Sequence, residues 1–553
     1  MDESSFFIGW DKKEVLVRAR NIVLVICLPV IEAVNHFIYR EKVSVKVAPE
    51  EWIIEADISM MQSAMEAGTL SAVQLVQLYV ERIRKHDGPI NAILELNPDA
   101  LEIAFSLDEE RRHSGRRSML HGIPILLKDN IDTCDRMHTS AGSVALANSI
   151  APTDAFIVAR LREAGAVLLG KANMTEWANA MSDSMWAGYS SRGGIVLNPY
   201  GPGNVFVGGS SSGSAAAVAA NFCAASIGTE TSGSIVCPAS YNFAVGIKPT
   251  VGLVSRSGII PLSRSQDTAG PIARTVTDAA ILLGALTGED ERDEAMMHSG
   301  RRTCDDYTPF LDASFIHKAR IGVPRYYCGE LDEAAAAVLE AAIAVLRSLG
   351  ATVVDSVELP CAGIEWDRNV VRHEFKKDLN DYLARLHPEV PVRTMKELIA
   401  YNKVHADVAL KYGQGGLERC EETSGSLHEP VYLRALQHNR MMSREQGIDY
   451  ALRAYQLDAL LFQGHHGSEI AARAGYPLVT VPGGYASNGS VSTAGYVTDG
   501  PYGITFSGTA YSEPTLIKLA YAFEQATKHR FPPDIGLNVE GEPVGELESL
   551  YEI

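Results

Sequence analysis

Residues 208–220 of the chain read GGSSSGSAAAVAA, a run of small residues that leads directly into a helix-forming segment. Glycine lets a chain turn tightly and lets a ligand approach the backbone. The N-terminus of the helix that follows directs free N–H groups and a partial positive charge into the same space. The stretch therefore predicts a turn that can receive an electron-rich group.

Three kinds of site suit such a turn. A phosphate-binding loop is the first, but no Gly-Lys-Ser/Thr follows and the dinucleotide-binding spacing is missing. A nucleophile elbow is the second, because residues 209–213 fit the pattern G-x-S-x-G with Ser211 at its centre. A flexible loop that caps a helix is the third. The stretch alone does not separate the last two.

Two further elements accompany this turn. Residues 228–238 read GTETSGSIVCP and form a second small-residue turn after an apolar strand at 224–227. Residues 121–130 read HGIPILLKDN, in which Lys128 closes an apolar run. Burial at the end of a strand would lower the pKa of this lysine, so that it could act as a neutral base. Taken alone, this run is better explained by a lysine that reaches solvent at the end of a strand.

Together the three elements resemble the amidase signature family. The resemblance extends over roughly residues 56–535, is strongest at 118–290 and includes KANMTEWAN at 171–179. It continues in VGIKPTVGLVSRSGIIPLSRSQDTAGPIARTVTDAA (245–280) and GITFSGTAYSEPTLIKLAYAFEQATK (503–528). The pattern GTETxGSIVCPA is similar to the branch that contains peptide amidases, whereas many members read GTDTGGSIRxPA.

Carried over to these positions, the resemblance implies a catalytic triad. Ser234 would be the nucleophile, and Ser210, joined to Gly209 by a cis peptide bond in this family, would bridge to Lys128 as the base. A serine hydroxyl needs a base to attack an amide, and the same relay run backwards protonates the leaving amine. Water would then cleave an acyl-enzyme. The family needs no cofactor.

The resemblance also implies an oxyanion site beside the nucleophile. Backbone N–H groups of Thr231, Ser232, Gly233 and Ser234 would hold the developing charge, and Ser210 would lie against the substrate. Ser232 stands where much of the family has glycine and the branch with peptide amidases has aspartate. Because this side chain would face the acyl pocket, the departure bears on the substrate.

A histidine-based hydrolase is the main competing mechanism. His465 and His466 lie in a glycine-flanked loop and His121 precedes a turn, so a Ser–His–Asp site around Ser211 can be imagined. The joint match of three motifs favours the lysine-based triad. An amidotransferase component that passes ammonia to a partner is a further alternative, although GTETxGSIVCPA favours a free-standing enzyme.

Helices alternate with short apolar strands on both sides of these motifs. This order predicts an α/β fold, and the resemblance implies one large domain with a central twisted mixed sheet covered by helices on both faces. A capping box, Ser71 with Gln74, marks the start of the first helix. Helices are expected at 71–88, 154–165, 278–286, 332–350 and 513–527, with strands at 167–169 and 352–354.

The resemblance divides the chain unevenly. Residues 1–55 are expected to be an N-terminal extension and residues 536–553 an acidic tail around a domain at 56–535. Within that domain, 118–290 would carry the core motifs and 364–450 would be a variable region that shapes the substrate site. We therefore expect an amidase that converts a carboxylic or peptidyl amide to the acid and ammonia or an amine. The natural amide stays open among short peptide, fatty and small-metabolite amides.

The composition is that of an ordinary globular protein, 46% hydrophobic and 21% charged. The net charge is −19 and no cluster of Lys and Arg compensates for it, which argues against nucleic-acid binding. The eight cysteines are scattered without a CxxC or a Cys/His cluster, which argues against a zinc site or a disulfide framework. We expect neither a metal nor an organic cofactor.

Residues 22–31, IVLVICLPVI, follow two arginines and resemble the core of a signal peptide. The run is shorter than the roughly 20 apolar residues that span a membrane, and Pro29 interrupts it. We expect a surface-packed extension and a cytoplasmic enzyme, with secretion or membrane contact through residues 22–39 as the alternative. The expected partner is a small-molecule amide, and the chain is expected to act as a monomer or homodimer.

Overall fold

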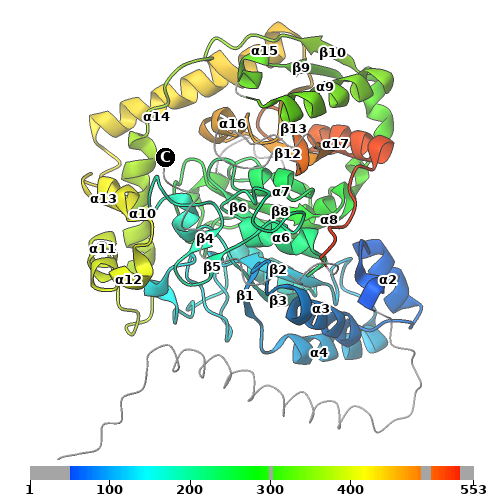
Figure 1. Ribbon diagram of the computed structural model, residues 1–553, viewed down its shortest axis with the longest axis vertical. Helices are drawn as coiled ribbons and strands as arrows, with labels where there is room; N and C mark the ends of the chain where they lie inside the picture. The colour runs from blue at the N-terminus through cyan, green and yellow to red at the C-terminus, as the bar shows by residue number, and fades with distance from the viewer. Residues whose placement is uncertain (1–49, 298–302, 330, 487–499, 536–553) are drawn as a thin grey trace, which may run out of the picture. The chain divides into compact units, whose positions relative to one another are not determined.

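The computed structural model describes residues 50–297, 303–329, 331–486 and 500–535 (Figure 1). The apolar segment at 22–39 and the tail at 536–553 lie outside the described residues, so the expectations for them stay untested. Within the described ranges, no helix has both the length and the apolar character needed to cross a membrane.

The described residues contain a large mixed β-sheet of eleven strands. Its strand order is β1-β3-β2-β6-β8-β7-β12-β13-β11-β9-β10, and β4 pairs only with β5 in a separate small sheet. The strands are β1 Ile93–Leu96, β2 Pro124–Lys128, β3 Val167–Ala172, β4 Tyr189–Ser190, β5 Gly194–Ile195, β6 Ala225–Glu230, β7 Val245–Lys248, β8 Thr268–Ala273, β9 Arg320–Val323, β10 Thr352–Asp355, β11 Ala459–Gln463, β12 Leu478–Ala486 and β13 Gly500–Ser507.

Helices pack against this sheet, and the predicted α/β fold class is confirmed (Figure 1). They are α2 Ile58–Glu66, α3 Ala72–His86, α4 Ala100–Ser114, α5 Phe156–Glu163, α6 Ser212–Ala219, α7 Val236–Tyr241, α8 Val276–Leu286, α9 Glu333–Ser348, α10 Asn369–Ala384, α11 Met395–Val404, α12 Ala406–Ala409, α13 Gly415–Glu421, α14 Pro430–Ser443, α15 Asp449–Ala454, α16 Ser468–Ala474 and α17 Glu513–Thr527.

Capping residues explain where the helices begin. Ser71 and Gln74 form the predicted reciprocal capping box at the start of α3. Helix α8 begins two residues before the predicted start at Asp278, because the side chain of Thr275 accepts a hydrogen bond from the Asp278 N–H and caps the helix there. Side-chain capping thus sets both starts.

Strand β2 lies between β3 and β6 and runs parallel to both. All five of its residues are buried, as expected for a strand covered on both faces. The carboxyl ends of parallel strands meet at one edge of a sheet, where ligands commonly bind in α/β folds. This arrangement brings Lys128, at the end of β2, next to the end of β6 at Thr229 and Glu230.

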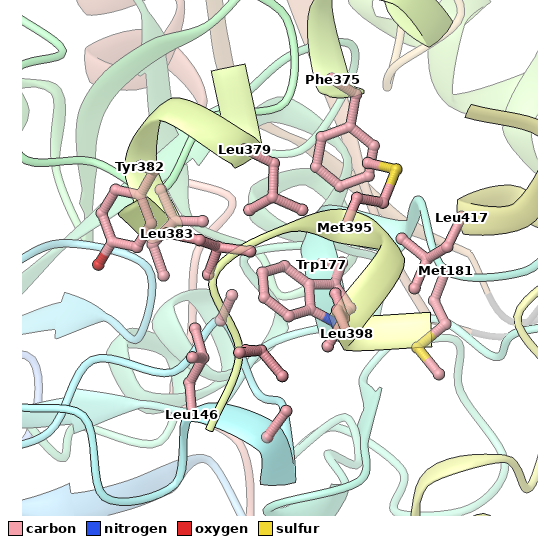
Figure 2. Close-up of a cluster of buried hydrophobic side chains, with 14 of the residues drawn as sticks. Leu146, Trp177, Met181, Phe375, Leu379, Tyr382, Leu383, Met395, Leu398 and Leu417 are labelled. Atoms are coloured by element: carbon pink, nitrogen blue, oxygen red, sulfur yellow. The ribbon is translucent and has the colours of Figure 1, made fainter. Parts of the chain in front are cut away.

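Helices α10 and α11 are joined to the rest of the fold by a hydrophobic cluster. Figure 2 shows Leu379 and Leu383 from α10 and Leu398 from α11 around the indole of Trp177. These four side chains are at most 2% exposed. The cluster anchors the segment that the sequence predicts to be variable, residues 364–450.

Candidate active site

Lys128 is fully buried at the carboxyl end of β2. Its Nζ lies 2.8 Å from Ser210 Oγ, 2.9 Å from Thr229 Oγ1 and 3.1 Å from the Thr229 carbonyl oxygen. A neutral amine has two N–H donors and one lone pair. If the two N–H groups serve Thr229, the lone pair is left for the hydroxyl proton of Ser210, which is the arrangement a base requires.

The surroundings of Lys128 favour its neutral form. Burial lowers the pKa of Lys128 to about 7, and the carboxylates of Glu230 and Asp267 oppose that shift by raising it. Asn130 donates to Thr229 Oγ1 at 3.0 Å and so helps to fix the partner of the lysine. Near neutral pH the amine can therefore exist in both protonation states.

Backbone hydrogen bonds connect the segments that carry Ser210 and Ser234. The Gly209–Ser210 peptide bond is cis, and the Ser210 carbonyl accepts a hydrogen bond from Thr175 N at 3.0 Å. The neighbouring Ser211 N–H donates to the carbonyl of Ser234 at 3.2 Å. Ser210 is fully buried, whereas Ser234 is 7% exposed. Among the described residues no hydrogen bond joins the hydroxyls of Ser210 and Ser234, and Ser234 is the more exposed of the two, so its hydroxyl is open to an incoming group.

Hydrogen bonds to the side chain of Glu230 hold the turn that carries Ser234. The carboxylate of Glu230 accepts hydrogen bonds from the N–H groups of Gly233 (2.8 Å), Ile235 (2.8 Å) and Val236 (3.0 Å). Gly233 has φ +83°, a conformation that favours glycine. A carboxylate at this place therefore caps α7 and shapes the turn before it.

These contacts show which of the predicted oxyanion donors already has a hydrogen-bond acceptor in the protein. The N–H of Gly233 is occupied by Glu230. For the N–H groups of Thr231, Ser232 and Ser234, the part of the chain that the structure describes offers no hydrogen-bond acceptor. These three N–H groups are the candidate donors to a substrate oxygen.

Asp267 fixes the opposite side of the turn. Its Oδ1 accepts a hydrogen bond from Thr231 Oγ1 at 2.6 Å, and its Oδ2 accepts from the N–H groups of Leu262 and Ser263 at 2.7 Å each. Burial raises the pKa of Asp267 to about 6. Neither Glu230 nor Asp267 was expected in the site from the sequence. Both lie within the quoted motifs, but their targets are backbone groups or distant residues that a single sequence does not reveal.

A cleft of about 710 Å³ opens at this turn. Asn130 and residues 229–231 line one side, and residues from 374 to 444 line another, so the segment predicted to shape the substrate site does face the cleft. Ser210 and Ser234 do not belong to its lining. The cleft thus reaches the turn at Thr229–Thr231 without enclosing the two serines.

Two residues of the competing mechanism, Ser211 and His121, are hydrogen-bonded elsewhere. Ser211 is fully buried, and its hydroxyl donates to Thr229 O at 3.1 Å and accepts from Thr229 N at 3.3 Å. His121 is buried with its Nε2 2.9 Å from the carbonyl of Leu107. No described hydrogen bond joins Ser211 to His465. This geometry does not favour a nucleophile at Ser211.

The chain is similar to known proteins over most of its length. The family profile described as "Amidase" matches residues 74–517. A protein of Arabidopsis thaliana described as a probable amidase is 41% identical over 497 residues, 87% of this chain and 92% of that protein. One component of the glutamyl-tRNA(Gln) amidotransferase of Exiguobacterium sibiricum is 33% identical over 86% of this chain and 98% of its own length.

The fold is also similar to that of solved amidase structures. The native peptide amidase from Stenotrophomonas maltophilia superposes with a TM-score of 0.80 at 44% identity, covering 88% of this chain and 100% of that chain.

Proposed function

The chain belongs to the amidase signature family, and on that premise we propose that it hydrolyses a peptidyl or other polar carboxylic amide through Ser234, Ser210 and Lys128. The observation that carries the proposal is the 2.8 Å contact between Ser210 Oγ and the Nζ of a buried lysine whose pKa lies at about 7. Such a lysine can accept a proton at physiological pH.

In the proposed reaction two protons move in sequence. Ser210 takes the proton of the Ser234 hydroxyl and passes its own to Lys128, so that the Ser234 oxygen attacks the amide carbon. The proton on Lys128 then returns through Ser210 to the leaving nitrogen as the C–N bond breaks, which releases ammonia and leaves an acyl ester on Ser234. A water molecule, deprotonated through the same relay, then attacks the acyl ester, and the acid is released as Ser234 regains its proton.

The N–H groups of Thr231, Ser232 and Ser234 are proposed to stabilise the oxyanion of both tetrahedral intermediates. An oxyanion donor of this kind is worth about 3–4 kcal/mol of transition-state stabilisation. In this proposal Gly233 gives the turn its shape rather than a hydrogen bond to substrate, because its N–H already serves Glu230.

The cleft supports a polar substrate over a fatty amide. Its lining includes charged side chains such as Arg292, Arg440 and Arg444 and also four tyrosines. A long alkyl chain would have to desolvate these groups without replacing their hydrogen bonds. A peptide amide such as the substrate that the name of the Stenotrophomonas maltophilia enzyme indicates can satisfy them instead.

The test is ammonia release from an N-acetylated dipeptide amide by the purified chain alone. We expect hydrolysis by the native chain and a loss of at least about 10³-fold for Ser234→Ala and Lys128→Met. Ser226→Ala is a matched control, because Ser226 is a buried serine of β6 that bonds to Leu126 O, and it should keep its activity.

Absence of ammonia release by a folded native chain would contradict a free-standing amidase. Release only after addition of a partner protein would favour the amidotransferase alternative, which the likeness to an amidotransferase component keeps in view.

A further inference from the structure

Six arginines line the cleft, and four of them are paired with carboxylates. These pairs balance their charges within the wall of the cleft and leave little net attraction for a ligand. The paired arginines are Arg256 with Asp293 (2.8 Å), Arg264 with Asp378 (2.9 Å), Arg292 with Asp290 (2.8 Å) and Arg385 with Asp132 (3.6 Å).

The other two, Arg440 and Arg444, stand four residues apart on and just after α14. No carboxylate of the described residues forms an ion pair with either side chain. Arg444 donates its Nε to the carbonyl of Ala474 at 2.8 Å, and its guanidinium carbon lies 5.4 Å from the ring centre of Tyr476, so its position is fixed. No hydrogen bond from its terminal nitrogens occurs among the described residues. Two guanidinium groups thus line the cleft without an ion-pair partner among the described residues.

Their arrangement is unfavourable without a ligand. Like charges at this helical spacing repel each other. Burial lowers the pKa of Arg440, and the charge of Arg444 lowers it further. An anion that contacts both guanidinium groups would remove this repulsion.

Glu374, the carboxylate whose charge acts on Arg440, already has other hydrogen-bond partners. Glu374 is fully buried; its Oε1 accepts from Tyr432 OH at 2.7 Å and its Oε2 accepts from Ser265 Oγ at 2.9 Å and from Ser263 Oγ. Its charge still raises the pKa of Arg440, but no hydrogen bond joins the two side chains in the described part of the chain. The donors of Arg440 therefore remain open.

We propose that Arg440 and Arg444 bind a carboxylate on the acyl part of the amide substrate, away from the amide group that is cleaved. This inference rests on the proposed function, because it assigns the substrate class of the same site. Arg440, Arg444 and Thr231 line the same cleft, so one ligand in this cleft can contact both the arginines and the turn that leads to Ser234. Guanidinium groups suit a carboxylate because each offers paired donors in a plane.

The experiment compares matched anionic and neutral peptide amides. Acetyl-Glu-Ala-amide and acetyl-Met-Ala-amide have side chains of similar size, and acetyl-Glu-amide and succinyl-Ala-Ala-amide place the carboxylate closer to or further from the cleaved bond. We expect kcat/KM for the best anionic amide to exceed that for its neutral match by about tenfold or more, mainly through KM. Arg440→Gln should remove most of this preference and leave the neutral amide within about twofold.

Arg444→Lys serves as a second variant, because it keeps the charge but not the paired donors. It should lower the preference for the anionic amide less than Arg440→Gln does. Arg292→Gln is the matched control, since Arg292 lines the same cleft but is paired with Asp290, and it should leave the preference unchanged.

Equal kcat/KM for anionic and neutral amides at every spacing would overturn the inference. So would an Arg440→Gln variant that loses stability and slows both classes equally, because Arg440 would then serve only to offset the charge of Glu374. If the native chain cleaves none of the amides, the proposed function fails separately. Calorimetric binding of N-acetylglutamate to the native chain but not to Arg440→Gln would then still support the anion site, and its absence would refute it.

Discussion

At the scale of single residues, the central feature is a lysine that the fold keeps out of water. The apolar run that ends in Lys128 predicts a buried strand, and β2 is buried along its whole length. The amine of Lys128 makes two hydrogen bonds to Thr229 and one to Ser210. A lysine exposed to water would be almost fully charged at neutral pH and could not accept a proton.

The first prediction concerns pH. Because protonated Lys128 cannot act as a base, kcat/KM should fall as pH decreases through about 7, the pKa of Lys128. The carboxylates that face the amine, Glu230 and Asp267, both raise this pKa. Asp267→Asn should therefore shift the acidic limb of the pH profile to lower pH, whatever it does to the maximal rate. A limb that stays in place or moves to higher pH would contradict the assignment of Lys128 as the base.

The second prediction concerns the hydroxyl of Thr231, which is held by Asp267 at 2.6 Å. Thr231→Val keeps the shape of the side chain but removes this bond, so the N–H of Thr231 is less firmly aimed. We expect kcat to fall by about tenfold with little change in KM, because the oxyanion develops only in the transition state. Thr231→Ser should restore most of the rate. Steady-state kinetics of the two variants measure kcat and KM. If Thr231→Ser has a kcat as low as that of Thr231→Val, the hydroxyl has no such role.

At the scale of secondary-structure elements, the site depends on the parallel pairing of β2 with β6, in which Leu127 lies opposite Ile227. This pairing places two motifs that are far apart in the sequence at one edge of the sheet. The helical segments could be predicted because their signals are local, as the capping box of α3 and the bounds of α17 show. The strand order could not, because it depends on contacts between distant segments.

The third prediction concerns the close packing of α6. A Cβ atom at Gly213 would lie 2.3 Å from the carbonyl oxygen of Asn173 and 2.4 Å from that of Ala92. Gly213→Ala should therefore displace the turn that carries Ser210, destabilise the protein by about 1–3 kcal/mol and lower kcat. Gly88→Ala is the control, because a Cβ there meets nothing within 4 Å. Chemical denaturation and ammonia release should separate the two variants, and equal behaviour would refute the packing argument.

The fourth prediction concerns the cluster in Figure 2 that fastens α10 and α11. Leu398 of α11 is fully buried there, so Leu398→Ala should cost about 2–5 kcal/mol in the free energy of unfolding. Val404 lies on the same helix but is 78% exposed, and Val404→Ala should change stability by less than about 0.5 kcal/mol. Urea unfolding measures the free energy of unfolding of both variants. Similar losses in the two variants would show that the cluster does not anchor the helix.

At the scale of the whole molecule, the sequence supports the family and the fold class better than it supports the substrate. The motifs around Ser210 and Ser234 are local and could be recognised directly. The carboxylates Glu230 and Asp267 were missed because their partners are backbone N–H groups and a distant hydroxyl. Arg440 has no motif around it, and its role follows only from the absence of a carboxylate partner among the described residues of the folded cleft.

The last prediction identifies the serine that becomes acylated, and it tests the proposed mechanism most directly. The purified chain is treated with a serine-reactive fluorophosphonate, digested and mapped by fragment mass spectrometry. The label should lie on Ser234, should be absent from Ser234→Ala and should form at least about 10²-fold more slowly in Lys128→Met. A label on Ser211, or one that depends on His465 and not on Lys128, would contradict the Ser–Ser–Lys mechanism.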